Sequence, residues 1–281
     1  MARCGRGSFA PWAFVVVLGS ETVTDPVWGK QQDKMLAVLA NMPTSIEEVV
    51  AKLKTITDIL GELTGGRPPL GGFNELYHTI TSDVLALRED GGFEDPGFLT
   101  ELDLQFARRY FAALLLWTNR DPSTPSVWKI LFEKKVGEAS NLQGAMAGVN
   151  AHIDFDLAHA LVETFKVRGL VPGPGRESLS VQHRDYGKIN DIFFEEIPKL
   201  RRRMYTHVLQ RILDKLVGSL DDDLQGLVVK ETRAAAWRDS YSLWILQKDP
   251  EAYAEYSRAL DDDATDASRI VFTPGFGNLV F

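Results

Sequence analysis

The sequence predicts an all-α fold: a single compact multi-helix domain with short Gly/Pro loops. Three observations support this prediction. Apolar residues recur at helical spacing along most of the chain, and glycine and proline clusters divide it into helix-length segments. No segment shows the alternation of apolar and polar residues that is typical of a half-buried strand. At 281 residues, with 44% apolar and 10% aromatic content, the chain is long enough to fill one large core.

Residues 1–43 are predicted to be a leader or extended segment, disordered in part, before a single helical domain over residues 44–271. Arg3 and Arg6 precede a short apolar run, as in a secretory signal, but the run is too short to span a bilayer. We therefore expect a cytoplasmic protein without a membrane span, and secretion is the alternative that the leader leaves open. Residues 272–281, rich in glycine and proline for their length, are predicted to be an extended tail.

Four helices are predicted before residue 140. The first begins at Thr44-Ser45, where a hydroxyl cap precedes acids in the first turn, and it should run to about Leu63. A glycine and proline cluster at residues 65–69 then ends it. The other three helices are expected at about 72–88, 95–118 and 127–135.

A long helix is predicted from the capping-box sequence at Ser140 to about Arg168, where the Gly/Pro-rich segment 169–175 follows. Later helices are expected at about 181–217, with a kink or break at Pro198, and at 226–247 and 250–260. No internal repeat interrupts this succession of helices.

The composition also narrows the choice of partners. A net charge of −8 argues against broad binding to nucleic acid or to an anionic membrane, since both require a basic surface. The only cysteine, Cys4, excludes an intramolecular disulfide and a cysteine-based zinc site. An anionic ligand must therefore be met by local arginines or by a metal. The oligomeric state does not follow from the sequence.

The long helix carries a polar row beside its apolar face. His152, Asp156, His159 and Glu163 are spaced four, three and four residues apart, so neighbours in the row can reach one another. Asp156 lies nearest the centre of the apolar arc. A carboxylate in that position is poorly hydrated unless it meets a cation or hydrogen-bond donors.

Three interpretations of His152 and Asp156 are open. The two side chains can share a divalent metal from one helical face. They can instead form a proton-transfer pair, in which the carboxylate orients the imidazole. The third interpretation is a buried hydrogen bond that ties this helix to its neighbours and has no chemical role.

The sequence from Gly148 to Leu157 resembles the G-x-N-A-H-I-x-x-D-L signature of an uncharacterised helical family that is abundant in actinobacteria and is labelled a domain of unknown function. Further segments resemble that family in the same order, and the similarity covers roughly residues 45–260. They begin at Phe73, Phe93, Phe106, His183 and Arg233. The label implies an all-helical fold but no reaction.

The pattern is also similar to the unusual fungal terpene cyclases that make humulene-type sesquiterpenes. This resemblance implies a lyase that ionises and cyclises a prenyl diphosphate, such as farnesyl diphosphate, with Mg²⁺ as cofactor. Such a reaction needs an acidic metal site, arginines for the leaving group and aromatic rings for the carbocations. The sequence contains candidates for all three.

The residue assignments follow from this resemblance. For catalysis they are Asn150, His152, Asp156 and Asn190, and for the metal His152, Asp154 and Asp156. For substrate binding they are Arg108, Arg109, His183, Tyr186 and Trp237. The D-D-x-x-D sequence at residues 262–266 is instead expected to be a solvated acidic turn, because charge runs usually remain in water.

Two other functions remain open at this stage. A metal-dependent phosphoester hydrolase would use the same histidine and aspartate to activate water, although five histidines are few for such an enzyme. A non-catalytic helical binding or scaffold protein would use the polar row only to fix the packing of the helices.

Overall fold

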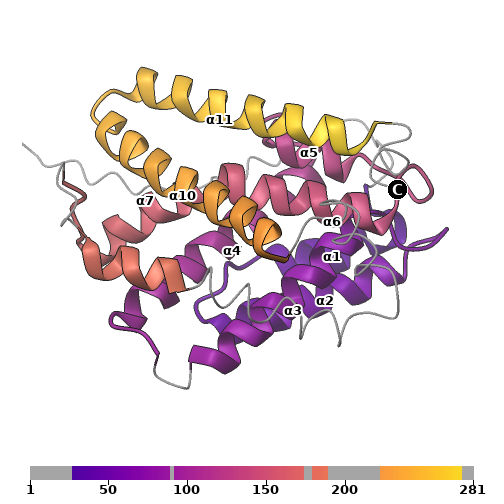
Figure 1. Cartoon of the computed structure of the whole chain (residues 1–281). Helices are drawn as coiled ribbons and strands as arrows, with labels where there is room; N and C mark the ends of the chain where they lie inside the picture. The colour runs from indigo at the N-terminus through magenta and orange to yellow at the C-terminus, as the bar shows by residue number, and fades with distance from the viewer. Residues whose placement is uncertain (1–26, 89–91, 174–178, 189–221, 274–281) are drawn as a thin grey trace, which may run out of the picture.

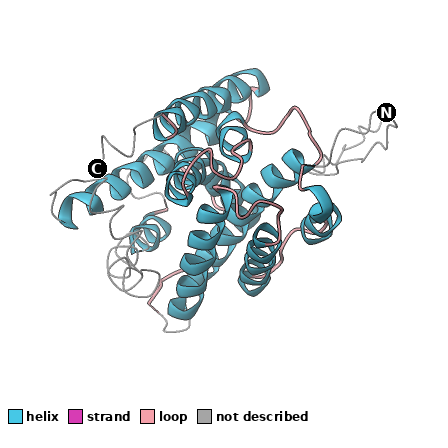
Figure 2. Cartoon of the chain, turned by 90° about the vertical axis from the view of Figure 1, so that its right-hand side faces the viewer, coloured by secondary structure: helices cyan, strands magenta, loops and turns pink. Residues whose placement is uncertain are grey.

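The computed structural model describes residues 27–88, 92–173, 179–188 and 222–273. Within these ranges the regular structure is helical, apart from one isolated bridge between Val136 and Ala139 (Figure 2). This confirms the predicted all-α class. In chain order the elements are η1 (Gly29–Gln31), α1 (Gln32–Leu39), α2 (Ile46–Gly61), α3 (Leu70–Arg88), α4 (Pro96–Thr118), α5 (Ser126–Phe132), α6 (Asn141–Asn150), η2 (Ala151–Asp156), α7 (Leu157–Arg168), α10 (Asp222–Leu246) and α11 (Pro250–Val271), and residues 180–188 are helical as well.

The capping signals in the sequence correctly place several helix starts. The Ser45 hydroxyl accepts a hydrogen bond from the Glu48 backbone N–H at the start of α2. The Asp95 carboxylate does the same for Phe98 at the start of α4, with a proline in the first turn. Ser140 and Gln143 form the expected reciprocal capping box before α6.

Two boundaries differ most from the prediction. Residues 29–39 are helical rather than extended, because Met35 and Leu39 lie four residues apart and bury their side chains in the core. Helix α11 continues to Val271, eleven residues beyond the expected end at 260, because Ala264, Thr265 and Ser268 also lie on its buried face. The leader at residues 1–26 and the tail from residue 274 lie outside the described residues.

The helices pack around the segment that runs from α6 through η2 to α7 (Figure 1). Helix α3 lies against α2 and α6, while α7 lies between α4 and α10. Helix α11 crosses α5, α6 and η2. The polar row predicted on the long helix is therefore enclosed by elements from both halves of the chain.

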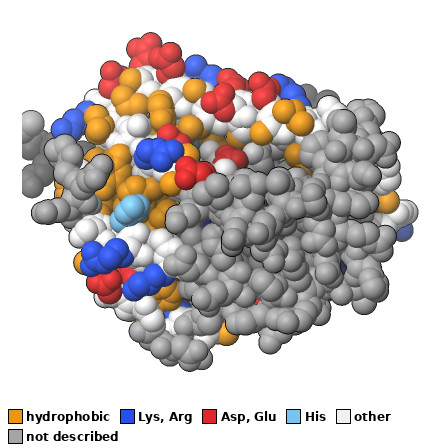
Figure 3. Space-filling view, in the orientation of Figure 1, with side chains coloured by type: hydrophobic (Ala, Val, Ile, Leu, Met, Phe, Trp, Pro, Cys, Tyr) orange, Lys and Arg blue, Asp and Glu red, His pale blue; other side chains and the backbone are white. Residues whose placement is uncertain are grey.

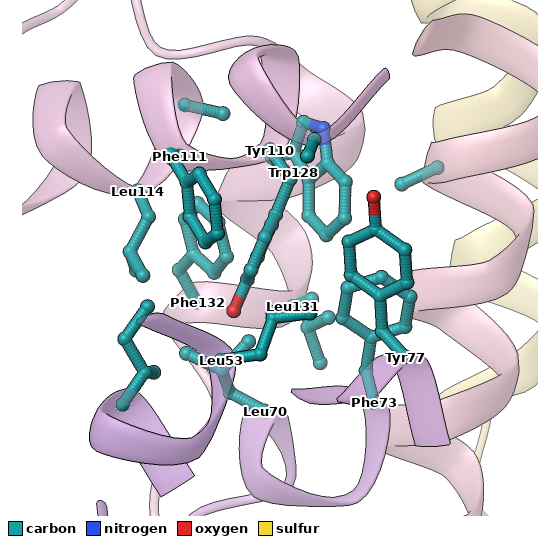
Figure 4. Close-up of a cluster of buried hydrophobic side chains, with 14 of the residues drawn as sticks. Leu53, Leu70, Phe73, Tyr77, Tyr110, Phe111, Leu114, Trp128, Leu131 and Phe132 are labelled. Carbon is teal, nitrogen blue, oxygen red and sulfur yellow. The ribbon is translucent and has the colours of Figure 1, made fainter. Parts of the chain in front are cut away.

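The buried apolar side chains form two clusters. One lies among α1–α6 and contains many aromatic rings, including Phe73, Tyr77, Tyr110, Trp128 and Phe132 (Figure 4). The other lies between α4, α7 and α10 and is built around Phe98, Phe165 and Trp237. The η2 segment borders both clusters, since Phe155 belongs to the first and the half-buried Ile153 packs against the second.

Glycines allow α3 and α6 to approach closely. A Cβ atom added at Gly148 would collide with the ring of Phe73, and one added at Gly144 would collide with the backbone carbonyl of Pro69. Gly148, the first residue of the family signature, therefore serves helix packing. This contact places the Phe73 ring directly beside the η2 segment.

A search for membrane-spanning helices found none of sufficient length and hydropathy among the residues that the structure describes.

Candidate functional site

The long predicted helix contains a change of helical geometry that the sequence did not indicate. Residues Ala151–Asp156 form a π-helical segment, and the Leu157 backbone N–H donates to the carbonyl of His152, five residues earlier. Short π segments within α-helices are frequent at functional sites. This one contains His152, Asp154 and Asp156, the three residues expected to bind a metal.

The Asp156 carboxylate, 1% exposed, is held by donors from three elements. Oδ1 accepts a hydrogen bond of 3.0 Å from Nε of Arg109 on α4. Oδ2 accepts one of 3.0 Å from the indole Nε1 of Trp128 on α5, and it lies 3.1 Å from Nδ1 of His152. The buried carboxylate is thus paired with one cation and two further donors, which offset its loss of hydration.

The imidazole of His152, 4% exposed, lies in an aromatic environment. The ring of Phe106 stacks on it with centroids 3.4 Å apart, and the ring of Tyr77 meets it edge to face at 4.6 Å. Phe73, Tyr110 and Trp128 lie further out, at 5.7–6.4 Å. Figure 4 shows how Phe73, Tyr77, Tyr110 and Trp128 gather from α3, α4 and α5.

The hydrogen bond to Asp156 fixes the orientation of this imidazole. Since a carboxylate accepts hydrogen bonds, Nδ1 of His152 carries the ring proton and donates it. Burial lowers the pKa of His152, although the contact with Asp156 opposes this effect. The imidazole is therefore neutral near pH 7. Its Nε2 has an unshared electron pair and no hydrogen-bond partner among the described residues.

Asp154 lies in a different environment from Asp156. Burial and, to a smaller extent, the charge of Asp239 on α10 together raise the pKa of Asp154 to about 6. Asp239 itself accepts a hydrogen bond of 2.8 Å from the hydroxyl of Tyr256 on α11. These two half-buried carboxyl groups therefore repel each other across the interface between η2 and α10.

Asp103, on α4, also has a raised pKa. Burial raises its pKa to about 7, even though the positive charges of Arg233 and Arg88 act in the opposite direction. Burial is the main cause of the raised pKa of Tyr77, and the negative charges of Asp103 and Asp156 raise it further by smaller amounts. Perturbed carboxyl groups of this kind concentrate at functional sites.

Two of the expected site residues serve other contacts. Arg108 donates from Nε and from Nη2 to the backbone carbonyl of Pro43, at 3.0 and 2.9 Å. Asn150 donates from Nδ2 to the Ala264 carbonyl and to the Ser268 hydroxyl on α11. The structure therefore brings Arg109, and not Arg108, to the carboxylate of Asp156.

His183, Tyr186 and Trp237 come together, but at the second apolar cluster, to which Tyr186 and Trp237 belong and beside which the exposed His183 lies. The rings of His183 and Tyr186 lie 4.8 and 4.9 Å from that of Trp237. The Tyr186 hydroxyl donates to the backbone carbonyl of Arg233, whose guanidinium lies 4.4 Å above the Tyr186 ring. This aromatic group ties residues 180–188 to α10. Asn190 lies outside the described residues.

The D-D-x-x-D sequence lies on α11 rather than in a turn, because the helix is longer than predicted. Asp262, Asp263 and Asp266 are exposed, as expected. Figure 3 shows acidic side chains along the top of the molecule, where Figure 1 places α11. Asp266 pairs with Arg269 on the same helix.

No group of three or more His, Cys, Asp or Glu side chains is placed to share a metal ion within the described ranges. His152 and Asp156 bind each other, and the guanidinium of Arg109 occupies the position beside Asp156 where a cation would lie. Within the described residues, neither Asp154 nor Asp239 forms an ion pair with a cation.

Several residues of the site were not found from the sequence. Trp128, Phe106 and Tyr77 belong to helices far from His152 in the chain, and aromatic residues at helical spacing also occur in ordinary cores. Asp239 is a single acid on a polar stretch of α10. The family-like segments that begin at Phe73 and Phe106 include Tyr77 and Phe106. This similarity was the sequence signal that could have pointed to these two rings.

Fold and site together define a helical protein with a buried histidine–aspartate pair inside an aromatic cluster. The chain belongs to a family of unknown function, DUF5995, whose model matches residues 46–274. Comparisons with curated proteins and with solved structures found no match. The family confirms the first resemblance noted in the sequence but supplies no reaction.

Proposed function

We propose that this protein is a lyase that ionises an allylic prenyl diphosphate and cyclises the resulting carbocation, with farnesyl diphosphate as the expected substrate. One observation carries the proposal: the unpartnered Nε2 of His152 lies among aromatic rings and belongs to an imidazole oriented by Asp156. Aromatic faces attract cations, and an oriented neutral imidazole accepts protons. A carbocation reaction that ends in proton loss needs both.

Residues of this chain act in two steps of the proposed reaction. In the first, the allylic C–O bond breaks, its electron pair leaves with the diphosphate, and the carbocation lies against the rings of Tyr77, Phe106 and Trp128. Between the two steps, a double bond of the same substrate attacks the cationic carbon, which closes the ring and moves the positive charge to another carbon. In the second, Nε2 of His152 takes a proton from the carbon beside this new cationic centre, and the C–H electrons form the alkene. In this proposal Phe106, which is half-buried and stacked on the imidazole, turns aside to admit the substrate.

Mg²⁺ fits the site only in part. Asp156 is unsuited to be a metal ligand, because Arg109 and Trp128 already donate hydrogen bonds to its two carboxylate oxygens. Asp154 and Asp239 do fit, since Mg²⁺ is usually held by one or two carboxylates together with substrate phosphates. Their mutual repulsion, which contributes to the raised pKa of Asp154, would be relieved by a divalent cation. When bound, Mg²⁺ would supply stabilisation of charge on the leaving diphosphate.

Incubation of the purified protein with farnesyl diphosphate and Mg²⁺, followed by gas chromatography of the extract, tests this proposal. We expect a cyclic hydrocarbon whose yield falls on the order of 100-fold or more in Asp154→Asn. Loss of one contact that stabilises charge in a transition state typically lowers the rate by about this factor. Asp266→Asn is the matched control, since Asp266 is an exposed aspartate. No hydrocarbon from farnesyl, geranyl or geranylgeranyl diphosphate would contradict the proposal.

A non-catalytic scaffold is the second candidate, and one observation favours it. The carboxylate of Asp156 is satisfied by donors from α4, α5 and η2, as expected for a contact that fixes helix packing. In that case loss of His152 or Asp156 changes stability and no activity. The hydrolase alternative would be supported by release of inorganic phosphate from simple phosphate esters in place of hydrocarbon.

A further inference from the structure

A serine and a histidine outside the proposed lyase site form a close pair between α7 and α11. Nε2 of His159 lies 2.9 Å from the hydroxyl oxygen of Ser257, and Nδ1 lies 2.9 Å from the backbone carbonyl of Phe155. Because a carbonyl can only accept a hydrogen bond, Nδ1 carries the ring proton. Nε2 therefore accepts the hydroxyl proton of Ser257, as a base does beside a serine nucleophile.

The imidazole of His159 is held in place from several sides. The Phe155 carbonyl occupies the position that a carboxylate has in serine hydrolases, where it selects the tautomer and the orientation of the ring. The ring of Phe155 lies 4.9 Å from the imidazole, and the ring of Tyr253 meets it edge to face at 6.2 Å. The histidine is buried, whereas Ser257 is half-buried.

A positive charge lies near this pair. The guanidinium of Arg109 lies 5.3 Å above the ring of Phe155, and its charge contributes to lowering the pKa of His159. Two groups of an acyl-transfer site are present here: a nucleophile, and a base with an orienting acceptor.

We propose that Ser257 and His159 form a second reactive site that takes small carboxylic esters, independent of the lyase site. The serine oxygen bonds to the ester carbonyl carbon while its proton passes to Nε2 of His159. The carbonyl then re-forms as the C–O bond to the alcohol breaks, and the imidazolium returns the proton to the departing alkoxide. Water hydrolyses the acyl-serine by the same proton transfers, releasing a carboxylic acid and restoring the hydroxyl.

The state of the histidine gives this site a recognisable pH dependence. Burial, with the charge of Arg109, lowers the pKa of His159 to about 3. Above about pH 5 the imidazole is therefore neutral, and its protonation state does not change with pH. The rate of attack by Ser257 should be independent of pH from about 5 to 8, whereas an ordinary serine reacts faster as hydroxide increases.

Reaction of the full chain with a fluorophosphonate probe, read by peptide mass mapping, tests the proposal. The internal control is Ser82, which is also half-buried but donates to the backbone carbonyl of His78 at 2.7 Å instead of to an imidazole. We expect labelling of Ser257 at least about 100-fold faster than labelling of Ser82, at a rate that does not change between pH 5 and 8.

Two variants complete the test. Ser257→Ala should abolish that label, and His159→Gln should slow it about 100-fold while the thermal unfolding transition is retained. Equal labelling of Ser257 and Ser82, or a label on Ser257 that His159→Gln leaves unchanged, would overturn the proposal. If His159→Gln does not fold, the ratio of the two labels and the pH profile of the unaltered chain decide the question.

Discussion

Arg109 and Asp156 form an ion pair of 3.0 Å in which the carboxylate side chain is 1% exposed and the guanidinium side chain is 23% exposed. Removing the charge of Asp156 leaves the partly buried guanidinium of Arg109 without its counter-charge. We expect Asp156→Asn to lower the free energy of unfolding by about 3 kcal/mol, as when one partner of a buried pair is lost. Urea denaturation measures this change.

The exposed pair of Asp266 and Arg269 is the control for that measurement. Asp266→Asn should change the free energy of unfolding by less than about 0.5 kcal/mol, because solvent screens the pair. Equal effects of the two substitutions would show that the Arg109–Asp156 pair does not stabilise the fold.

The indole of Trp128 provides a separate test of the carboxylate's environment. Trp128→Phe keeps a buried ring but removes the N–H that donates to Asp156. We expect a cost of about 1–3 kcal/mol in unfolding free energy, measured by urea denaturation. Trp117→Phe is the matched control, because the Trp117 N–H has no acceptor among the described residues. A larger loss in the control would argue against a role for the hydrogen bond.

Asp103 should make stability depend on pH. Its pKa is raised to about 7, chiefly by burial, so between its ordinary pKa near 3.8 and pH 7 the folded chain binds more protons than the unfolded chain. This contribution to stability is present below about pH 4 and is lost as the pH rises through 7. Asp103→Asn should therefore be more stable than the unaltered chain at pH 8, by at least about 1 kcal/mol, and the advantage should shrink toward pH 4. Denaturation at both pH values checks this, and an advantage that is the same at both would contradict it.

Gly148 should be required for the contact between α3 and α6. A methyl group at this position collides with the ring of Phe73, so Gly148→Ala should cost about 1–3 kcal/mol through overpacking. Gly61 is the control, because an added Cβ there meets nothing within 4 Å, and Gly61→Ala should be neutral or stabilising. The two midpoints of thermal unfolding compare the effects directly. A stable Gly148→Ala variant would show that the helices can move apart.

The helices were predictable where local chemistry decides them. Ser45, Asp95 and Ser140 cap helices with their own side chains, so the sequence alone locates those starts. The end of α11 was not predictable, because it depends on burying Ala264 and Ser268 against distant parts of the chain. The π-helical segment was missed as well, since apolar spacing does not distinguish it from an α-helix.

For the site, the pairing of His152 with Asp156 followed from their spacing of four residues on one helix. The choice between Arg108 and Arg109 did not, since adjacent residues point to different sides and only the packing of α4 shows which side meets Asp156. The pairing of Asp154 with Asp239 likewise depends on the contact between η2 and α10.

The most direct test of the central claim follows both diphosphate release and hydrocarbon product in one incubation with farnesyl diphosphate and Mg²⁺, for the unaltered chain and for His152→Gln. If His152 accepts the final proton, the variant releases diphosphate but its hydrocarbon is replaced by alcohols or by other alkene isomers. An unchanged mixture of hydrocarbons from a variant that remains folded would contradict the role proposed for His152.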